Sequence, residues 1–321
     1  SMTACGGNSA STDGSSNDGG ASASGGSYKV SVILKTLAAE YWQYVKSGAE
    51  DYASEHSDKV TVEVKGPSSE TAFDEMQNMI ETDLSSGSYD GVIISPLQSD
   101  TAAQLVSGTK LPIVAIDTNF TAPEVKSFVG TGNEAAAKKG GEAAVEAAKA
   151  AGWTDIKCIE IAGVQGDQTN TARMNGYKAG VEEAGGTFLS DEVQYADATA
   201  DRATTAMEAI MQTHPEGIAI ICANNDDMAM AAARAAQGHD AYKNTIFLGF
   251  NGDRAACEAI LAGQMTMSVA QMAYEMGYKA VETMVQVLDG ETVDEFVDSG
   301  SDVVTPDNAQ ERLDTLKTQL H

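Results

Sequence analysis

Short apolar runs alternate with amphipathic segments from Tyr28 almost to the end of the chain. In the first part, the pattern predicts strands at residues 29–34, 60–64, 91–94 and 113–116, and helices at 40–56, 70–84 and near 100–106. Residues 128–130 are predicted to form a short crossing strand before an alanine-rich helix that begins near residue 133. Short apolar strands separated by helices indicate a parallel sheet that helices cover on both faces.

A second set of the same kind follows. Strands are predicted at residues 156–161, 188–193, 217–223, 246–250 and 267–270, and helices at 169–184, 202–211, after 223, after 250 and at 274–288. A short strand at 303–304 and a helix from residue 308 bring the chain to its end. The sequence therefore predicts an α/β protein of two similar lobes, which agrees with a length of 321 residues.

The most informative junction lies between Gly217 and Gly238, where an apolar strand ends at Ala223 and a helix begins almost at once. The turn between them consists of the polar residues 224–227 (NNDD). At such a junction, free backbone N–H groups and short polar side chains face the crevice in which open α/β sheets bind ligands. The turn is therefore a candidate binding edge, and the alternative is that it only caps the helix. We expect Asp226 to be the capping residue.

The charge of the chain excludes one class of partner. Forty-seven acidic and twenty basic residues give a formal net charge of −27. Such a charge repels phosphate backbones and anionic lipid, so no nucleic acid partner is expected. No apolar run approaches the roughly eighteen residues that a membrane-spanning helix needs.

The N-terminal segment predicts a tether. Residues 1–27 consist mostly of Ser, Gly, Ala, Asn and Asp, which cannot bury a core and should stay disordered. Cys5, preceded by Thr3 and Ala4, resembles the processed end of a bacterial lipoprotein, whose cysteine carries lipid after the signal peptide is removed. The alternative is an ordinary cysteine in a disordered tail.

The other cysteines do not indicate a disulfide framework or a zinc site. Cys158 and Cys222 lie in predicted strands and Cys257 in a predicted helix, and there is no C-x-x-C motif. We expect these three residues to be small core residues and predict no metal site.

The loops that follow the predicted strands contain hydrogen-bonding groups but no histidine. These loops are residues 35–42, 95–99, 117–119, 162–173, 223–227 and 251–254. The sequence has no G-x-S-x-G, H-E-x-x-H or P-loop motif, and Gly130-x-Gly132 lacks the third glycine of a dinucleotide site. We therefore predict neither an enzyme nor a bound cofactor, since the acidic pair Asp226 and Asp227 is typical of a helix start.

Several of these segments resemble the periplasmic sugar-binding proteins of ABC transporters, in the ribose-binding branch that shares its fold with lactose-repressor effector domains. The resemblance extends from Tyr28 to about Pro306. It rests on motifs that occur in the family's order: 111–117 (LPIVAID), 173–177 (RMNGY), 223–229 (ANNDDMA), 248–252 (LGFNG) and 268–271 (SVAQ). The implied fold is the type I periplasmic binding protein fold, with two doubly wound parallel-sheet lobes joined by a three-strand hinge. No DNA-binding headpiece precedes Tyr28, so a repressor is not expected.

The resemblance also implies roles for particular residues. Tyr41 and Trp42 match the family's paired aromatic residues, which stack on the sugar ring; the alternative is that both belong to the helix core. The residues that match its hydrogen-bonding positions are Asp117, Arg173, Asn225, Asn251 and Gln271. For these, the alternatives are a mutual or surface ion pair for Asp117 and Arg173, capping by Asn225, a plain turn at Asn251 and a structural role for Gln271 in the hinge.

The chain departs from the ribose binders at positions that bear on specificity. Residues 38–40 (AAE) replace the family's Asn in the first loop, Thr118 replaces Arg, and Asn251 replaces Asp. Lys35, Glu40 and Thr118 are therefore possible further ligand-binding residues. Ribose is in doubt, and another pentose, a hexose, a polyol or a furanose-like signal molecule would fit as well. The calcium loop of some galactose-binding relatives is not visible.

We therefore expect a monomeric, extracytoplasmic solute-binding lipoprotein that closes on a small sugar or polyol and delivers it to an ABC permease in the membrane. The expected N-terminal lobe is residues 28–131 with 272–301, and the expected C-terminal lobe is 132–271 with 302–321. The alternative is a sensor that presents its closed form to a chemoreceptor or a sensor kinase.

Overall fold

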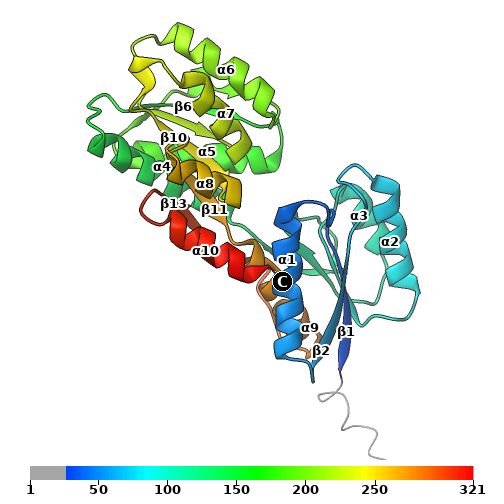
Figure 1. Ribbon diagram of the computed structural model, residues 1–321. Coiled ribbons are helices and arrows are strands. Elements are labelled where there is room, and N and C mark those ends of the chain that lie inside the picture. The colour runs from blue at the N-terminus through cyan, green and yellow to red at the C-terminus, as the bar shows by residue number, and fades with distance from the viewer. Residues whose placement is uncertain (1–26, 321) are drawn as a thin grey trace, which may run out of the picture.

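The computed structural model describes residues 27–320, which form two lobes, each with a central sheet and flanking helices (Figure 1). The six strands of the first sheet lie in the order β12-β5-β4-β3-β1-β2, and all neighbours in it are parallel. The strands are β1 (Tyr28–Ile33), β2 (Val60–Lys65), β3 (Gly91–Ile94), β4 (Ile113–Ile116), β5 (Val125–Gly130) and β12 (Phe296–Asp298). Its helices are α1 (Glu40–Glu55), α2 (Phe73–Ser85), α3 (Ser99–Val106) and α9 (Ala273–Leu288).

The second sheet has the order β13-β11-β10-β9-β6-β7, and β8 also pairs with β6. Its strands are β6 (Lys157–Ala162), β7 (Thr187–Phe188), β8 (Gln194–Tyr195), β9 (Ile220–Ala223), β10 (Ile246–Asn251), β11 (Met267–Gln271) and β13 (Ser301–Val304). Its helices are α4 (Asn133–Ala150), α5 (Gln168–Glu183), α6 (Ala200–Thr213), α7 (Asp226–Ala236), α8 (Arg254–Leu261) and α10 (Ala309–Gln319), with a short 3₁₀ helix, η2, at Asp240–Tyr242. Only β13 is antiparallel to its neighbour among these described strands.

Burial explains why the apolar runs form strands. Every residue of β3, β4 and β9 is buried, because helices cover both faces of each sheet. The prediction of an α/β fold with two parallel-sheet lobes is confirmed.

The chain passes between the two sheets three times. β5 leads into α4, β11 leads into α9, and β12 leads into β13. The first two passages are joined by a hydrogen bond of 2.8 Å from Thr131 Oγ1 to Gln271 Oε1. Helix α10 lies alongside them, and the Ser47 hydroxyl of α1 donates to the carbonyl oxygen of Gln319 near its end (Figure 1). The lobes are therefore connected by three segments of the chain and by the C-terminal helix.

Two segments differ from the sequence prediction. Residues 188–193 are not one strand, because the polar residues Ser190–Glu192 form the 3₁₀ helix η1 between β7 and β8, each of which pairs briefly with β6. Strand β12 was not predicted. It is an edge strand with Phe296 44% exposed, so its residues lack the continuous apolar pattern of a central strand.

Three cysteines lie in the described part of the chain, and all are buried and free. Cys158 is in β6, Cys222 in β9 and Cys257 in α8, as predicted. The Sγ atoms of Cys158 and Cys222 lie 3.5 Å apart across neighbouring strands, a proximity that the sequence does not reveal. Within residues 27–320 no cluster of His, Cys, Asp and Glu could hold a metal ion. None of the helices in this range is both long and apolar enough to span a bilayer.

Helices α1 and α9 cross at glycine residues. A Cβ atom at Gly277 would lie 1.9 Å from the carbonyl oxygen of Val45, and one at Gly48 would lie 1.9 Å from that of Tyr274. Since both obstacles are backbone atoms, only glycine permits this approach of the helices.

We expect Gly277→Ala to lower the free energy of unfolding by about 1–3 kcal/mol, because the added methyl group forces α1 and α9 apart. Urea denaturation followed by circular dichroism measures the change. Gln286→Ala, at an exposed position of the same helix, is the control and should have little effect. Equal stability of Gly277→Ala and the wild-type protein would contradict this account of the helix contact.

Candidate functional site

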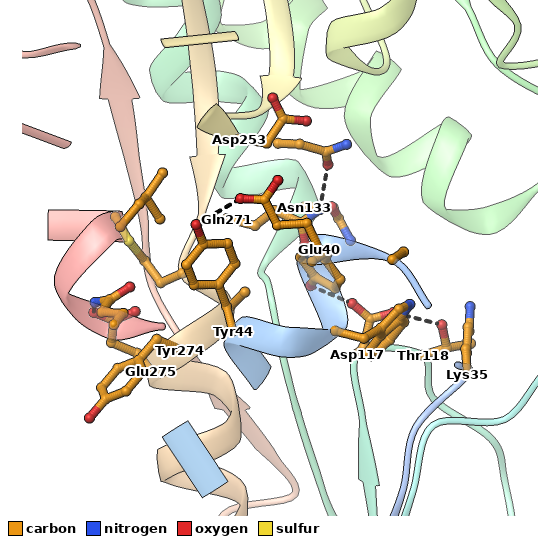
Figure 2. Close-up of a pocket in the computed structure, with 18 of the residues that line it drawn as sticks. Lys35, Glu40, Tyr44, Asp117, Thr118, Asn133, Asp253, Gln271, Tyr274 and Glu275 are labelled. Atoms are coloured by element: carbon orange, nitrogen blue, oxygen red, sulfur yellow. Dashed lines mark hydrogen bonds between the residues drawn. The ribbon is translucent and has the colours of Figure 1, made fainter. Parts of the chain in front are cut away.

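A cavity of about 460 Å³ lies between the lobes, at the carboxyl ends of the central strands. Both lobes contribute polar and aromatic side chains to it (Figure 2). Those from the predicted set are Lys35, Glu40, Tyr41, Trp42, Asp117, Thr118, Arg173, Asn251 and Gln271. The cavity thus brings together residues that are up to 236 positions apart between Lys35 and Gln271 in the sequence.

Asp117 follows β4 in the first lobe, and its carboxylate lines the cavity. Its backbone has φ of 65°, a left-handed conformation that Asp tolerates better than most residues. Tyr41 Oη donates to Asp117 Oδ1 at 2.6 Å, and Thr118 Oγ1 donates to Oδ2 at 3.2 Å. Burial, followed by the charge of Asp117, raises the pKa of Tyr41 well above its ordinary value, so this hydroxyl stays protonated and acts as a donor.

Arg173, on α5 of the second lobe, is held by two hydrogen bonds and by a contact with an aromatic ring. Its Nε donates to Asn133 Oδ1 at 3.0 Å and its Nη1 to the carbonyl oxygen of Asn224 at 2.7 Å. The guanidinium carbon lies 3.8 Å from the centre of the Phe250 ring. Burial lowers the pKa of Arg173, but an arginine remains charged in proteins. The fixed guanidinium is therefore suited to donating hydrogen bonds into the cavity.

Gln271 and Asn251 form a hydrogen-bonded pair at the passage between the lobes. Gln271 Nε2 donates to Asn251 Oδ1 at 2.7 Å, while Gln271 Oε1 accepts from Thr131. Both groups of the Gln271 amide are thus used within the protein, whereas the Asn251 amide nitrogen donates to no group within residues 27–320. Asn251 is the last residue of β10 and has a φ of 131°, a backbone conformation that favours glycine.

The turn after β9 differs from its predicted arrangement. Asn225, and not Asp226, caps α7: its Oδ1 accepts from the backbone N–H of Met228 at 2.8 Å. Asn225 Nδ2 donates to the carbonyl oxygen of Ala198 at 3.1 Å, and Asn225 is not among the residues that line the cavity. A ligand contact by Asn225 stays a prediction.

The prediction that Asp226 caps the helix is wrong. Its side chain turns inward and is buried, where Oδ1 accepts from Ser268 Oγ at 2.6 Å and Oδ2 from the Gly252 N–H at 2.8 Å. Burial, together with the nearby charge of Asp253, raises the pKa of Asp226 to about 7. Asp226 therefore ties the turn to the ends of β10 and β11, a role that only the packed sheet creates.

Trp42 and Glu40 both border the cavity but have other partners. Trp42 is 4% exposed and meets Tyr41 edge to face, with ring centres 5.0 Å apart, so most of the indole belongs to the core. Glu40 Oε1 accepts from Arg254 Nε at 2.5 Å and from Tyr44 Oη at 2.8 Å. Since Glu40 belongs to the first lobe and Arg254 to the second, this ion pair crosses the cleft.

Some cavity residues were not predicted. Thr169 and Asp253 belong to the predicted segments 162–173 and 251–254 that follow strands, and Asn133 follows the crossing strand, so their positions after strands are a signal for them. Arg312, on α10, has no such signal. It lines the cavity and donates from Nε to the carbonyl oxygen of Gly252 at 2.7 Å and from Nη2 to that of Gln271 at 3.1 Å, so it holds the ends of β10 and β11 together.

Comparisons with known proteins identify the family and support the fold. Residues 30–292 match the model of the family described as periplasmic binding protein domain. The chain is 30% identical over 264 residues to a D-allose-binding periplasmic protein of Escherichia coli strain K12, covering 79% of this chain and 82% of that one. It is 27% identical over 268 residues to the ribose import binding protein RbsB of the same organism, covering 82% and 86%. A periplasmic ribose ABC transporter structure from Conexibacter woesei DSM 14684 superposes with a TM-score of 0.78 at 19% identity, covering 93% and 99%, and supports the fold.

Proposed function

Because this chain belongs to the family of periplasmic binding protein domains, we propose that it is an extracytoplasmic solute-binding protein for a small polyhydroxylated ligand, a sugar or polyol. The observation that carries the proposal is that the two lobes present side chains of opposite charge to one cavity. Asp117 of the first lobe offers acceptors, and Arg173 of the second offers donors. Sugar hydroxyl groups donate and accept at once, so such a ligand can satisfy both.

Aldoses are the first ligands to test. Relatives of this chain are named for binding D-allose and for ribose import. The aromatic ring of Tyr41 borders the cavity beside Asp117, where it can stack on the apolar face of a sugar ring. The family and these relatives are binding proteins, and we propose no catalytic step.

Ligand contacts from both lobes stabilise only the closed arrangement, so binding shifts an equilibrium between open and closed forms. We propose that an ABC permease in the membrane recognises the closed form and receives the ligand from a monomer. The name of the ribose import relative supports a transport role. Cys5, the proposed site of lipid attachment, lies outside the described residues.

Titration calorimetry with pentoses, hexoses and polyols tests this proposal. We expect at least one of them to bind with a Kd near micromolar, about −8 kcal/mol. Asp117→Asn should lower the affinity for that ligand at least tenfold, because the amide offers one acceptor oxygen where the carboxylate offers two. Asp191→Asn, at an exposed position of η1, is the control. Equal affinity of Asp117→Asn and the wild-type protein would place the site elsewhere, and no binding by any compound would contradict the proposed function.

A further inference from the structure

The hydroxyl group of Tyr41 makes a contact that stacking of its ring on a ligand does not require. It lies within the polar cluster, 2.6 Å from Asp117 Oδ1 and 3.4 Å from Gln271 Oε1. A phenol has one hydrogen to donate, and the shorter, charge-assisted contact takes it. Gln271 Oε1 already accepts from Thr131 at 2.8 Å, so Asp117 is the partner of the Tyr41 hydroxyl.

This bond reduces what Asp117 can offer to a ligand. An ionised carboxylate has about four acceptor positions, two on each oxygen. Tyr41 takes one on Oδ1, and Thr118 takes one on Oδ2 at 3.2 Å. Of the described residues, no other side chain donates to this carboxylate, so each oxygen keeps one position for a ligand hydroxyl.

The same bond fixes the direction of the remaining positions. The Asp117 backbone is held by its N–H, which donates to the Val129 carbonyl oxygen at 2.9 Å, and by its left-handed conformation. With the backbone held and one donor bound on each oxygen, the carboxylate has little freedom to rotate. The free acceptor positions therefore point to two fixed places in the cavity.

We propose that the Tyr41 hydroxyl is a positioning group that sets ligand selectivity through Asp117. It limits that carboxylate to one ligand hydroxyl on each oxygen and fixes where those hydroxyls must lie. The protein then distinguishes sugars by the configuration of the two neighbouring hydroxyl groups that reach Asp117. This inference rests on the proposed function, since it concerns the same cavity.

Tyr41→Phe tests the proposal, because it keeps the ring and removes only the hydroxyl. Affinities are measured for the best wild-type ligand, for its epimers at each hydroxyl carbon and for its monodeoxy analogues. Freed from Tyr41, Oδ1 gains an acceptor position and freedom to rotate, so we expect the ratio of affinities between the parent sugar and one epimer to change at least fivefold. The ratios for hydroxyl groups remote from Asp117 should stay the same.

Thr118→Val is the matched variant, because it frees the other oxygen at nearly constant side-chain volume. It should change the ratio for a hydroxyl group different from the one that Tyr41→Phe affects. If Tyr41→Phe lowers the affinity for every sugar by one common factor, or leaves all affinities unchanged, the hydroxyl has no selective role. The inference is then overturned, while the proposed function stands. Failure of the wild-type protein to bind any sugar or polyol would overturn both.

Discussion

Arg173→Met is expected to weaken sugar binding at least a hundredfold, a loss of about 3 kcal/mol. A hydrogen bond to a charged group contributes about 1.5–3 kcal/mol, and a guanidinium in a closed cleft donates more than one. The contacts with Asn133, Asn224 and Phe250 already hold Arg173 in place, so little entropy is lost when the ligand binds. Calorimetry with the best wild-type ligand measures the loss.

Two variants make this result interpretable. Arg173→Lys keeps the charge but not the planar arrangement of donors, so we expect its affinity to fall clearly below that of the wild-type protein. Arg202→Met removes an exposed arginine whose partner is Asp197, away from the cavity, and should bind normally. Circular dichroism checks that Arg173→Met is folded. If the Arg173→Met protein is folded and its affinity is unchanged, Arg173 does not bind the ligand.

Glu160→Gln is expected to stabilise the protein at alkaline pH by up to about 5 kcal/mol. Glu160 lies in β6 with 0% exposure, and burial raises its pKa from 4.5 to about 8. Its Oε1 is 4.0 Å from Cys222 Sγ, and its Oε2 has no hydrogen-bond partner within residues 27–320. An ionised carboxylate at this position is buried without a cationic partner among residues 27–320, which is why the neutral form is favoured.

The sign of the pH dependence follows from proton binding. Between about pH 4.5 and pH 8 the folded protein holds the Glu160 proton and the unfolded chain does not, so stability falls as pH rises through this range. The pKa difference of about 3.5 corresponds to about 5 kcal/mol once both forms are ionised. Glutamine has the shape of the protonated acid, so the variant should match the wild-type protein near pH 5 and exceed it near pH 9.

Denaturant unfolding at pH 5, 7 and 9 measures these differences. Asp226, with its pKa of about 7, acts in the same direction, so Glu160→Gln should retain a smaller fall in stability that ends near pH 7. Glu182→Gln, at an exposed position of α5, is the control and should follow the wild-type profile. Parallel profiles for Glu160→Gln and the wild-type protein would show that Glu160 is not the titrating group.

Much of the cavity could be predicted because strand ends are local features. Asp117 and Asn251 each follow an apolar run, and the carboxyl ends of parallel strands meet at one edge of a sheet. Position along the chain therefore placed these residues beside the cavity. The roles of Asn225 and Asp226 could not be predicted, because both can cap a helix and the choice depends on Ser268 and Gly252, which are distant in sequence.

The sequence by itself determined the α/β class, the two lobes and most of the segments that border the cleft, since apolar periodicity and strand ends depend on neighbouring residues. Of the predicted loops, residues 95–99 and 223–227 do not line the cavity. Only the tertiary structure decided how each polar group is used. Tyr41 lies 76 positions from Asp117, and Arg312 lies 60 positions from Gly252, yet hydrogen bonds between these residues arrange the cavity wall. Hydrogen bonding requires atoms within about 3 Å, and no local pattern specifies which distant atoms come that close.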